Sequence, residues 1–197
     1  MLKIYPVVVG PIETNCYIVA TAGNDAWIID PGAEAETIIE TITQKKLLPK
    51  AILITHGHYD HILAAPELAT KYAIPVWYPN ADQYLLPAEK AAGILPPDFN
   101  LPNTHYYTET IETEIPIQVI TTPGHTAGQC CLLIADNLFS GDMLFAEGYL
   151  GRTDLWGGSA VAIKQSLQKL LKLPNATKVF PGHGPASTIG IERGYHE

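Results

Sequence analysis

Apolar and polar runs alternate along the chain in a pattern that predicts strands interrupted by helices. In the first half, β-rich runs bounded by Gly-containing turns predict strands at 2–9, 14–20, 26–29, 51–54 and 76–78. The spacing of an amphipathic helix that packs on a sheet is shown by the apolar residues Ala35, Ile38, Ile39 and Ile42. A second helix is predicted at 62–72, with Pro66 in its early turns, where proline is better tolerated.

The second half follows the same plan. Strands are predicted at 115–121, 130–135, 138–139 and 178–180. Ser159 can cap a helix, which Pro174 ends. The stretch 86–104 is rich in proline, which predicts irregular structure; we interpret it as a lid or wall of a substrate cleft, with a passive surface loop as the alternative. Mixed strands and helices favour a layered α/β arrangement.

Composition narrows the class of protein. A chain of 197 residues, 47% hydrophobic and 16% charged, fits a single domain spanning 1–197. The net charge of −8 argues against nucleic acid as a partner, and no apolar run is long enough to span a membrane. The N-terminus is typical of a strand rather than of a signal peptide. Three cysteines in apolar surroundings predict buried free thiols, and therefore a cytoplasmic protein.

The most informative stretch is 55–61, Thr-His-Gly-His-Tyr-Asp-His, which follows an apolar run. Imidazole and carboxylate groups are the preferred ligands of zinc, iron and manganese. Residues i and i+2 do not share a helical face, so His56 and His58 converge only if the chain turns after the strand. Asp60 and His61 then point elsewhere, which indicates a site for two ions. The alternative is a solvated, histidine-rich loop.

Three further candidate ligands lie far along the chain. His125, Asp142 and His183 each follow a short apolar strand and a Gly-containing turn. Loops at the ends of rigid strands are common positions for catalytic groups. His105 and His196 lie outside any such motif and are expected at the surface.

The HxHxDH motif, followed by separate His, Asp and His segments, resembles the metallo-β-lactamase superfamily over nearly the whole chain. The resemblance implies an αββα sandwich, with two mixed sheets packed face to face and helices outside. It also implies a ligand set. The first ion would be held by His56, His58 and His125, and the second by Asp60, His61 and His183, with Asp142 bridging. Asp30 would support a ligating histidine, although a simple turn-forming role is the alternative.

Two divalent ions of this kind, zinc foremost and iron or manganese as alternatives, can share a hydroxide that attacks a carbonyl carbon. Asp60 would orient that hydroxide. Asp142 stands where many true β-lactamases carry cysteine, and no export signal is recognised, so antibiotic hydrolysis is not expected. The segment 151–159 is similar to that of glyoxalase II-like (hydroxyacylglutathione hydrolase-like) proteins, which implies a small acyl thioester as the substrate.

Tyr149 and Arg152 are candidate substrate contacts, and the alternative for Arg152 is a loop ion pair with Asp154. The C-terminal helical region that binds glutathione in glyoxalase II has no counterpart after His183, so a loose preference for the thiol is expected. Three alternatives remain open: a persulfide dioxygenase with one iron on the counterparts of His58, His125 and Asp142, a lactone hydrolase, and a non-catalytic metal-binding module. The oligomeric state is not indicated.

Overall fold

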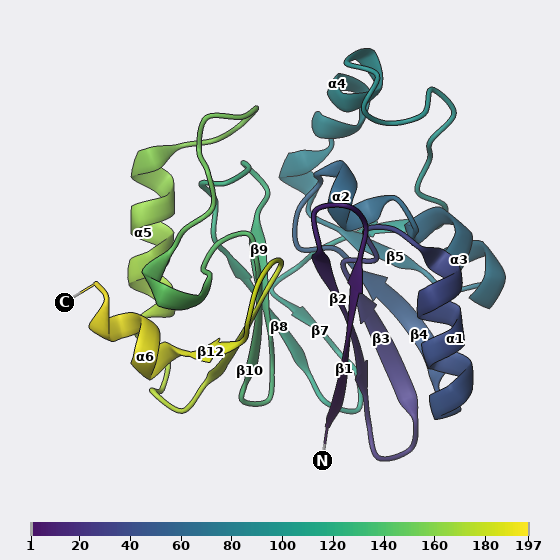
Figure 1. Ribbon diagram of the computed structural model, residues 1–197, viewed down its shortest axis with the longest axis horizontal. Helices are drawn as coiled ribbons and strands as arrows, with labels where there is room; N and C mark the ends of the chain where they lie inside the picture. Colours follow the sequence, from purple (N-terminus) through teal and green to yellow (C-terminus); the bar gives the residue numbers. More distant parts are fainter. Residues whose placement is uncertain (1, 197) are drawn as a thin grey trace. The chain divides into compact units, whose positions relative to one another are not determined.

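The structure is a computed structural model that describes residues 2–196. It divides into two compact units, of which unit 1 comprises Met1–Tyr78 and Gln83–Tyr106, and unit 2 comprises Pro79–Asp82 and Tyr107–Glu197. Each unit contains one six-stranded mixed sheet with helices on one of its faces. Figure 1 shows the strands and helices by label. The prediction of a single domain stays a prediction.

The sheet of unit 1 has the order β1-β2-β3-β4-β5-β6. Its strands are β1 (Lys3–Val9), β2 (Thr14–Ala20), β3 (Asp25–Ile29), β4 (Leu48–Leu53), β5 (Val76–Tyr78) and β6 (Thr104–Tyr106). The first three run antiparallel, whereas β3, β4, β5 and β6 are parallel to one another. The carboxyl ends of β3, β4 and β5 therefore lie side by side at one edge of this sheet.

Helices α1 (Ala35–Lys45) and α3 (Ala65–Tyr72) cover one face of this sheet (Figure 1). The predicted stripe Ala35, Ile38, Ile39 and Ile42 is buried, which confirms the orientation expected for the first helix. The core of unit 1 joins this stripe to Leu68 of α3 and to Ile18, Ile28 and Ile52 of the strands. Burial of this apolar surface is the main force that holds the unit together.

The predicted helix at 62–72 is confirmed over Ala65–Tyr72, where α3 ends at the predicted residue, but its start differs, because Tyr59–Ile62 form a separate short helix, α2. The amide of Ala64 donates to the carbonyl of Pro31 at 3.0 Å instead of continuing α2. Pro66 lies in the first positions of α3, where its missing N–H is not needed. Two features coincide with the break after Ile62: the contact of Ala64 with a distant loop, and Pro66, which lacks the N–H that would bond to the carbonyl of Ile62.

The prediction of irregular structure at 86–104 is confirmed for the part between α4 and β6, whereas its start belongs to the short helix α4 (Leu85–Ala91), which includes Pro87 in its first turn. Beyond this helix the loop is anchored by Leu95, Phe99 and Leu101, which belong to the buried core of unit 1. The interpretation of this stretch as a lid or cleft wall stays a prediction.

The sheet of unit 2 has the order β12-β11-β10-β9-β8-β7. Its strands are β7 (Thr110–Ile111), β8 (Ile117–Thr121), β9 (Cys130–Ile134), β10 (Asn137–Gly141), β11 (Lys178–Pro181) and β12 (Ser187–Thr188). Only β10 and β11 pair in parallel among these described strands. Their carboxyl ends therefore lie next to each other at one edge of the sheet.

Helices α5 (Ala160–Leu170) and α6 (Ile189–Gly194) lie on one side of this sheet (Figure 1). Ser159 caps α5 as predicted, since its hydroxyl accepts a hydrogen bond from the amide of Ala162. Ile163, Leu167 and Leu170 pack with Leu138 and Val179 in the core of unit 2. The short 3-10 turns η1 (Asn80–Asp82) and η2 (Ala146–Gly148) complete the unit.

Across residues 2–196, none of the helices combines the length and apolar character that crossing a membrane requires. The three cysteines, Cys16, Cys130 and Cys131, are free and buried, as the sequence predicted. Burial raises the pKa of Cys131 to about 12 and that of Cys16 well above the usual value for a thiol. The thiolate, which is the reactive form, is therefore suppressed in the folded protein.

The native protein should accordingly resist thiol reagents. We expect negligible reaction with an aromatic disulfide reagent at about pH 8, and titration of all three thiols after denaturation. Absorbance of the released chromophore measures both. Rapid reaction of a thiol in the native protein would contradict the burial of these side chains.

Candidate metal centre

In unit 1, the candidate ligands follow the carboxyl ends of neighbouring parallel strands. Ile29 at the end of β3 lies opposite Leu53 at the end of β4. Asp30 therefore stands beside Thr55, which begins the histidine-rich stretch. A backbone hydrogen bond from Asp30 to Leu53, at 3.1 Å, continues the pairing past the last strand residue.

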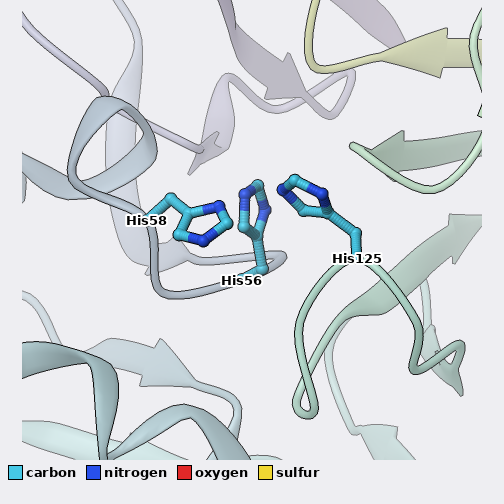
Figure 2. Close-up of side chains that lie close together, drawn as sticks. All are labelled: His56, His58 and His125. Atoms are coloured by element: carbon cyan, nitrogen blue, oxygen red, sulfur yellow. The ribbon is translucent and has the colours of Figure 1, made fainter. Parts of the chain in front are cut away.

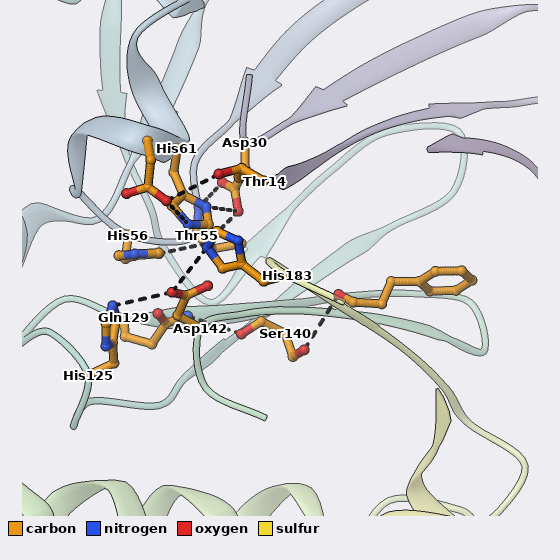
Figure 3. Close-up of polar contacts among 12 residues, drawn as sticks. Thr14, Asp30, Thr55, His56, His61, His125, Gln129, Ser140, Asp142 and His183 are labelled. Atoms are coloured by element: carbon orange, nitrogen blue, oxygen red, sulfur yellow. Dashed lines mark hydrogen bonds and ion pairs between the residues drawn. The ribbon is translucent and has the colours of Figure 1, made fainter. Parts of the chain in front are cut away.

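Asp30 is a buried carboxylate that organises this edge (Figure 3). It accepts hydrogen bonds from the amide of Thr55 at 2.7 Å and from the hydroxyl of Thr55 at 2.7 Å. The Nδ1 atom of His61 lies 3.1 Å from the same carboxylate. Three donors thus surround a side chain that is only 2% exposed. Their hydrogen bonds offset the free-energy cost of removing the carboxylate from water.

These contacts select the tautomers of two histidines. His61 donates from Nδ1 to Asp30, which leaves its Nε2 lone pair for a metal ion. The hydroxyl of Thr55 gives its only proton to Asp30, so it accepts from Nδ1 of His56, 3.1 Å away. Both imidazoles therefore carry their proton on Nδ1 and present Nε2, which is a form that binds metal.

The remaining donors of unit 1 lie close to these two. The rings of His56 and His58 are 4.9 Å apart in a T-shaped arrangement, and both extend from the turn after β4 (Figure 2). Oδ2 of Asp60 lies 3.2 Å from Nε2 of His61 and accepts a hydrogen bond from the hydroxyl of Thr14, also at 3.2 Å. Unit 1 thus gathers three imidazoles and one carboxylate in one place.

In unit 2, Asp142 and His183 follow the adjacent ends of β10 and β11 (Figure 3). His125 lies on the loop between β8 and β9. Oδ2 of Asp142 is 3.6 Å from Nε2 of His125 and 3.6 Å from Nε2 of His183. One carboxylate oxygen thus stands at equal distance from two imidazoles, which is the position that a shared ligand requires.

The Gly151–Arg152 backbone fixes His125. Nδ1 of His125 donates to the carbonyl oxygen of Arg152 at 2.8 Å, so Nε2 again carries the lone pair. A Cβ atom added at Gly151 would stand 1.9 Å from the carbonyl oxygen of Asp142 and 3.0 Å from Nδ1 of His125. Only glycine fits at this crossing of two ligand-bearing segments.

The Arg152 side chain has a different role from its carbonyl. Its guanidinium donates to both carboxylate oxygens of Asp154, at 2.8 and 2.7 Å, and both side chains are largely exposed. This pairing lowers the pKa of Asp154 to about 2, mainly through the hydrogen bonds from Arg152. The ion pair was the alternative that the sequence left open for these two residues.

A hollow of about 360 Å³ lies beside His183 within unit 2. Its lining includes Phe145, Tyr149 and Pro185, together with the acidic side chain of Glu147. Tyr149 is 64% exposed, so its ring is available to a ligand. Of the two predicted substrate contacts, Tyr149 lines this hollow and Arg152 does not.

The structure therefore distributes the predicted residues between the units. Unit 1 carries His56, His58, Asp60, His61 and Asp30, and unit 2 carries His125, Asp142, His183, Tyr149 and Arg152. Sequence reasoning missed the supporting roles of Thr14, Thr55 and Gly151. Thr55 and Gly151 lie in the segments 55–61 and 151–159, but their roles depend on contacts with Asp30 and Asp142, which are distant in the chain. His105 is exposed and hydrogen-bonded to Asn103, outside the metal-ligand groups.

The donor set fits divalent transition metals. Five imidazoles and two carboxylates belong to the groups able to hold an ion: His56, His58, His61, His125, His183, Asp60 and Asp142. Nitrogen and oxygen donors of this kind suit zinc, iron and manganese. The three Nδ1 contacts described above also present the nitrogen lone pairs that coordination needs.

Residues 9–183 match the family model described as the metallo-beta-lactamase superfamily. The chain belongs to the metallo-β-lactamase superfamily. The crystal structure of the BLEG-1 B3 metallo-β-lactamase is similar to it with a TM-score of 0.88 and 34% identity, covering 98% of this chain and 97% of that one. The predicted α/β sandwich class, with two mixed sheets and helices, is confirmed by this match.

Two other superfamily members bear on the site. The hydroxyacylglutathione hydrolase GloC of Haemophilus influenzae is 34% identical over 203 residues, which cover 98% of this chain and 94% of the relative. The crystal structure of TTHA1623 in a di-iron-bound form has a TM-score of 0.85 and 36% identity, covering 96% of each chain. A dinuclear centre is therefore present in a similar superfamily protein.

Asp30→Asn should weaken metal binding. The amide keeps one acceptor oxygen but turns an NH2 group toward donors, so His56 and His61 lose their fixed orientation. We expect metal affinity to fall by about 10- to 100-fold, measured by competition with a chromophoric chelator. Asp25→Asn is the control, since Asp25 lies at the other end of β3, where its carboxylate forms an ion pair with Lys50. Equal affinities in both variants would refute the role of Asp30.

Gly151→Ala should impair the centre more than Arg152→Ala. The added methyl group collides with the Asp142 carbonyl, whereas removal of the guanidinium leaves the backbone contact to His125 intact. We expect lower metal content for Gly151→Ala and unchanged content for Arg152→Ala, measured by mass spectrometry of the elements. The reverse order would show that the side chain of Arg152, not its carbonyl, supports His125.

Proposed function

We propose that this protein is a dinuclear metal-dependent hydrolase of small acyl thioesters. The observation that carries the proposal is a complete set of seven nitrogen and oxygen donors, three of whose imidazoles are held at Nδ1. Superfamily membership and the similarity to GloC favour hydrolysis over a storage or transport role for the metal.

In the proposed arrangement the ligands of both units act together. His56, His58 and His125 would hold one ion, and Asp60, His61 and His183 the other, with Asp142 shared between them. The equal distances from Asp142 to the two imidazoles of unit 2 support the shared role. Zinc is the first candidate for both positions, and the di-iron form of TTHA1623 makes iron the main alternative.

Two ions bound in this way supply an activated water and polarise a carbonyl group. Asp60 is the proposed catalytic residue, which would orient the attacking water. The hydroxyl of Thr14 and the ring of His61 fix its carboxylate for this task. A thiolate is a good leaving group, so thioester cleavage places little demand on a general acid.

The hollow beside His183 is the proposed position of the substrate. Phe145, Tyr149 and Pro185 give it an apolar wall suited to a short acyl or thioalkyl chain. We propose Tyr149 as a direct contact and assign Arg152 a weaker role, since its guanidinium is engaged by Asp154. The substrate would be a small molecule, and the buried free thiols favour a cytoplasmic location.

Hydrolysis of β-lactams is the second candidate function. The similarity to the BLEG-1 enzyme, over 98% of this chain, favours it. Both reactions begin with attack of water on a carbonyl carbon, so the same donor set serves either one. The difference lies in the leaving group: an amide nitrogen needs a proton before it departs, and a thiolate does not.

The purified protein should bind two divalent ions and cleave thioesters. We expect hydrolysis of lactoylglutathione and of acyl thioesters of other thiols. The release of free thiol measures this hydrolysis. Parallel assays test the other candidate functions. A chromogenic cephalosporin tests β-lactam hydrolysis, a lactone tests lactone hydrolysis, and oxygen uptake by the iron-loaded protein with glutathione persulfide tests dioxygenase activity. Oxygen uptake without thioester cleavage, or saturation at one ion per chain, would overturn the proposal.

Asp142→Asn provides the matching negative control for this assay. The amide keeps the shape but loses the charge that two cations would share, so turnover should fall by about 10- to 100-fold or more. Asp136→Asn, at the opposite and exposed end of β10, should leave turnover unchanged. Normal hydrolysis by Asp142→Asn with two bound ions would show that Asp142 is misassigned.

A further inference from the structure

Asp82 is a buried carboxylate in unit 2 that no sequence motif marks. It ends the turn η1, and its side chain is fully buried. Oδ2 accepts a hydrogen bond from the hydroxyl of Thr126 at 2.7 Å, and Oδ1 accepts one from the amide of Gly128 at 2.6 Å. Both bonds are short, as expected for an ionised acceptor.

The two partners of Asp82 belong to the loop that carries His125. This loop joins β8 to β9, and Thr126 directly follows the histidine. The loop is closed at its base by a backbone bond from Thr122 to Gln129 at 2.9 Å. Asp82 bonds to the part of the loop that follows His125. It packs closely there, since a Cβ atom at Gly128 would lie 2.6 Å from Cγ of Asp82.

We propose that Asp82 is a positioning residue that fixes the loop of His125 for metal binding. The carbonyl of Arg152 sets the ring and tautomer of His125, but it does not hold the backbone from which the ring extends. Asp82 supplies that second constraint through Thr126 and Gly128. The inference rests on the proposed role of His125 as a ligand, and it adds a residue outside the donor set.

Within unit 1, Tyr78 lies close to the histidine-rich stretch. A Cβ atom at Gly57, between His56 and His58, would stand 2.1 Å from the hydroxyl oxygen of Tyr78. Tyr78 ends β5 and is buried. Asp82 follows it by four residues.

The chemistry of Asp82 makes a conservative variant informative. Asparagine retains one acceptor oxygen, so its NH2 group must face either the Thr126 hydroxyl or the Gly128 amide, and one bond is lost. Thr126→Val removes the hydroxyl with little change in shape. Thr126→Ser retains the hydroxyl and should restore the contact.

Glu192 offers a matched control within the same unit. It is fully buried and likewise accepts one backbone hydrogen bond, from Gly148 at 2.7 Å, and one hydroxyl hydrogen bond, from Ser187. These bonds hold η2 and β12 rather than the loop of His125. Glu192→Gln therefore reproduces the loss of a buried acceptor without touching that loop.

The experiment measures metal affinity by chelator competition for Asp82→Asn, Thr126→Val, Thr126→Ser, Glu192→Gln and His125→Ala. We expect Asp82→Asn and Thr126→Val to weaken binding of one ion by about 10- to 100-fold, with Thr126→Ser and Glu192→Gln unchanged. In the metal-free proteins, ¹⁵N shifts of the His125 imidazole should move in the first two variants and not in the control. Thermal unfolding of the metal-free forms reports the loss of stability separately.

The outcomes distinguish the proposal from its premise. If His125→Ala binds both ions normally, His125 is not a ligand and the premise fails. If His125→Ala loses an ion while Asp82→Asn and Thr126→Val bind normally, or if Glu192→Gln weakens binding as much as they do, Asp82 is merely structural. Should Asp82→Asn fail to fold, Thr126→Val decides the question by the same comparison.

Discussion

The hydrogen bonds to the buried carboxylate of Asp30 are the interaction on which the metal-binding edge of unit 1 depends. Burying a carboxylate without hydrogen-bond partners is unfavourable, and a buried polar group left without a partner typically costs about 1–3 kcal/mol. Asp30 avoids this cost because Thr55 and His61 supply three donors. The same bonds dictate which nitrogen of His56 and His61 remains free to coordinate. The hydrogen bonds that hold the β3–β4 edge therefore also orient two of the candidate ligands.

The arrangement of a buried carboxylate at a loop recurs in unit 2. Asp82 and Glu192 each accept one backbone N–H and one hydroxyl, as Asp30 does. In each case the backbone of a loop donates its hydrogen bond to a buried carboxyl side chain instead of to a neighbouring strand. A loop held in this way keeps its conformation without a helix or strand of its own, which is what the placement of a ligand demands.

Both units present donors at the carboxyl ends of parallel strands, although His125 lies on the loop between the antiparallel strands β8 and β9. In unit 1 the parallel strands are β3 and β4, and in unit 2 they are β10 and β11, the parallel pair of its sheet. In a parallel pair, the segments that follow the two strands begin at the same edge of the sheet. Asp30 therefore lies beside Thr55, and Asp142 lies close to His183. In an antiparallel pair, the segments that follow the two strands would begin at opposite edges of the sheet. The direction of a few strands therefore decides which distant residues become neighbours.

Local sequence was enough to predict most strands, the buried stripe of α1, the Ser159 cap and the seven candidate ligands, because each depends on residues close together in the chain or on a compact motif. It did not predict the separate helix α2, after which an amide bonds to Pro31, or the short helix α4, which accommodates Pro87 in its first turn. It also missed Asp82, which acts on a residue 44 positions away, and Gly151, whose importance lies in the absence of a side chain. Periodicity and motif spacing report the preferences of neighbouring residues, so the sequence by itself determined the elements and the donors. Only the tertiary structure decided what holds each donor in place, because those contacts join segments that no local pattern relates.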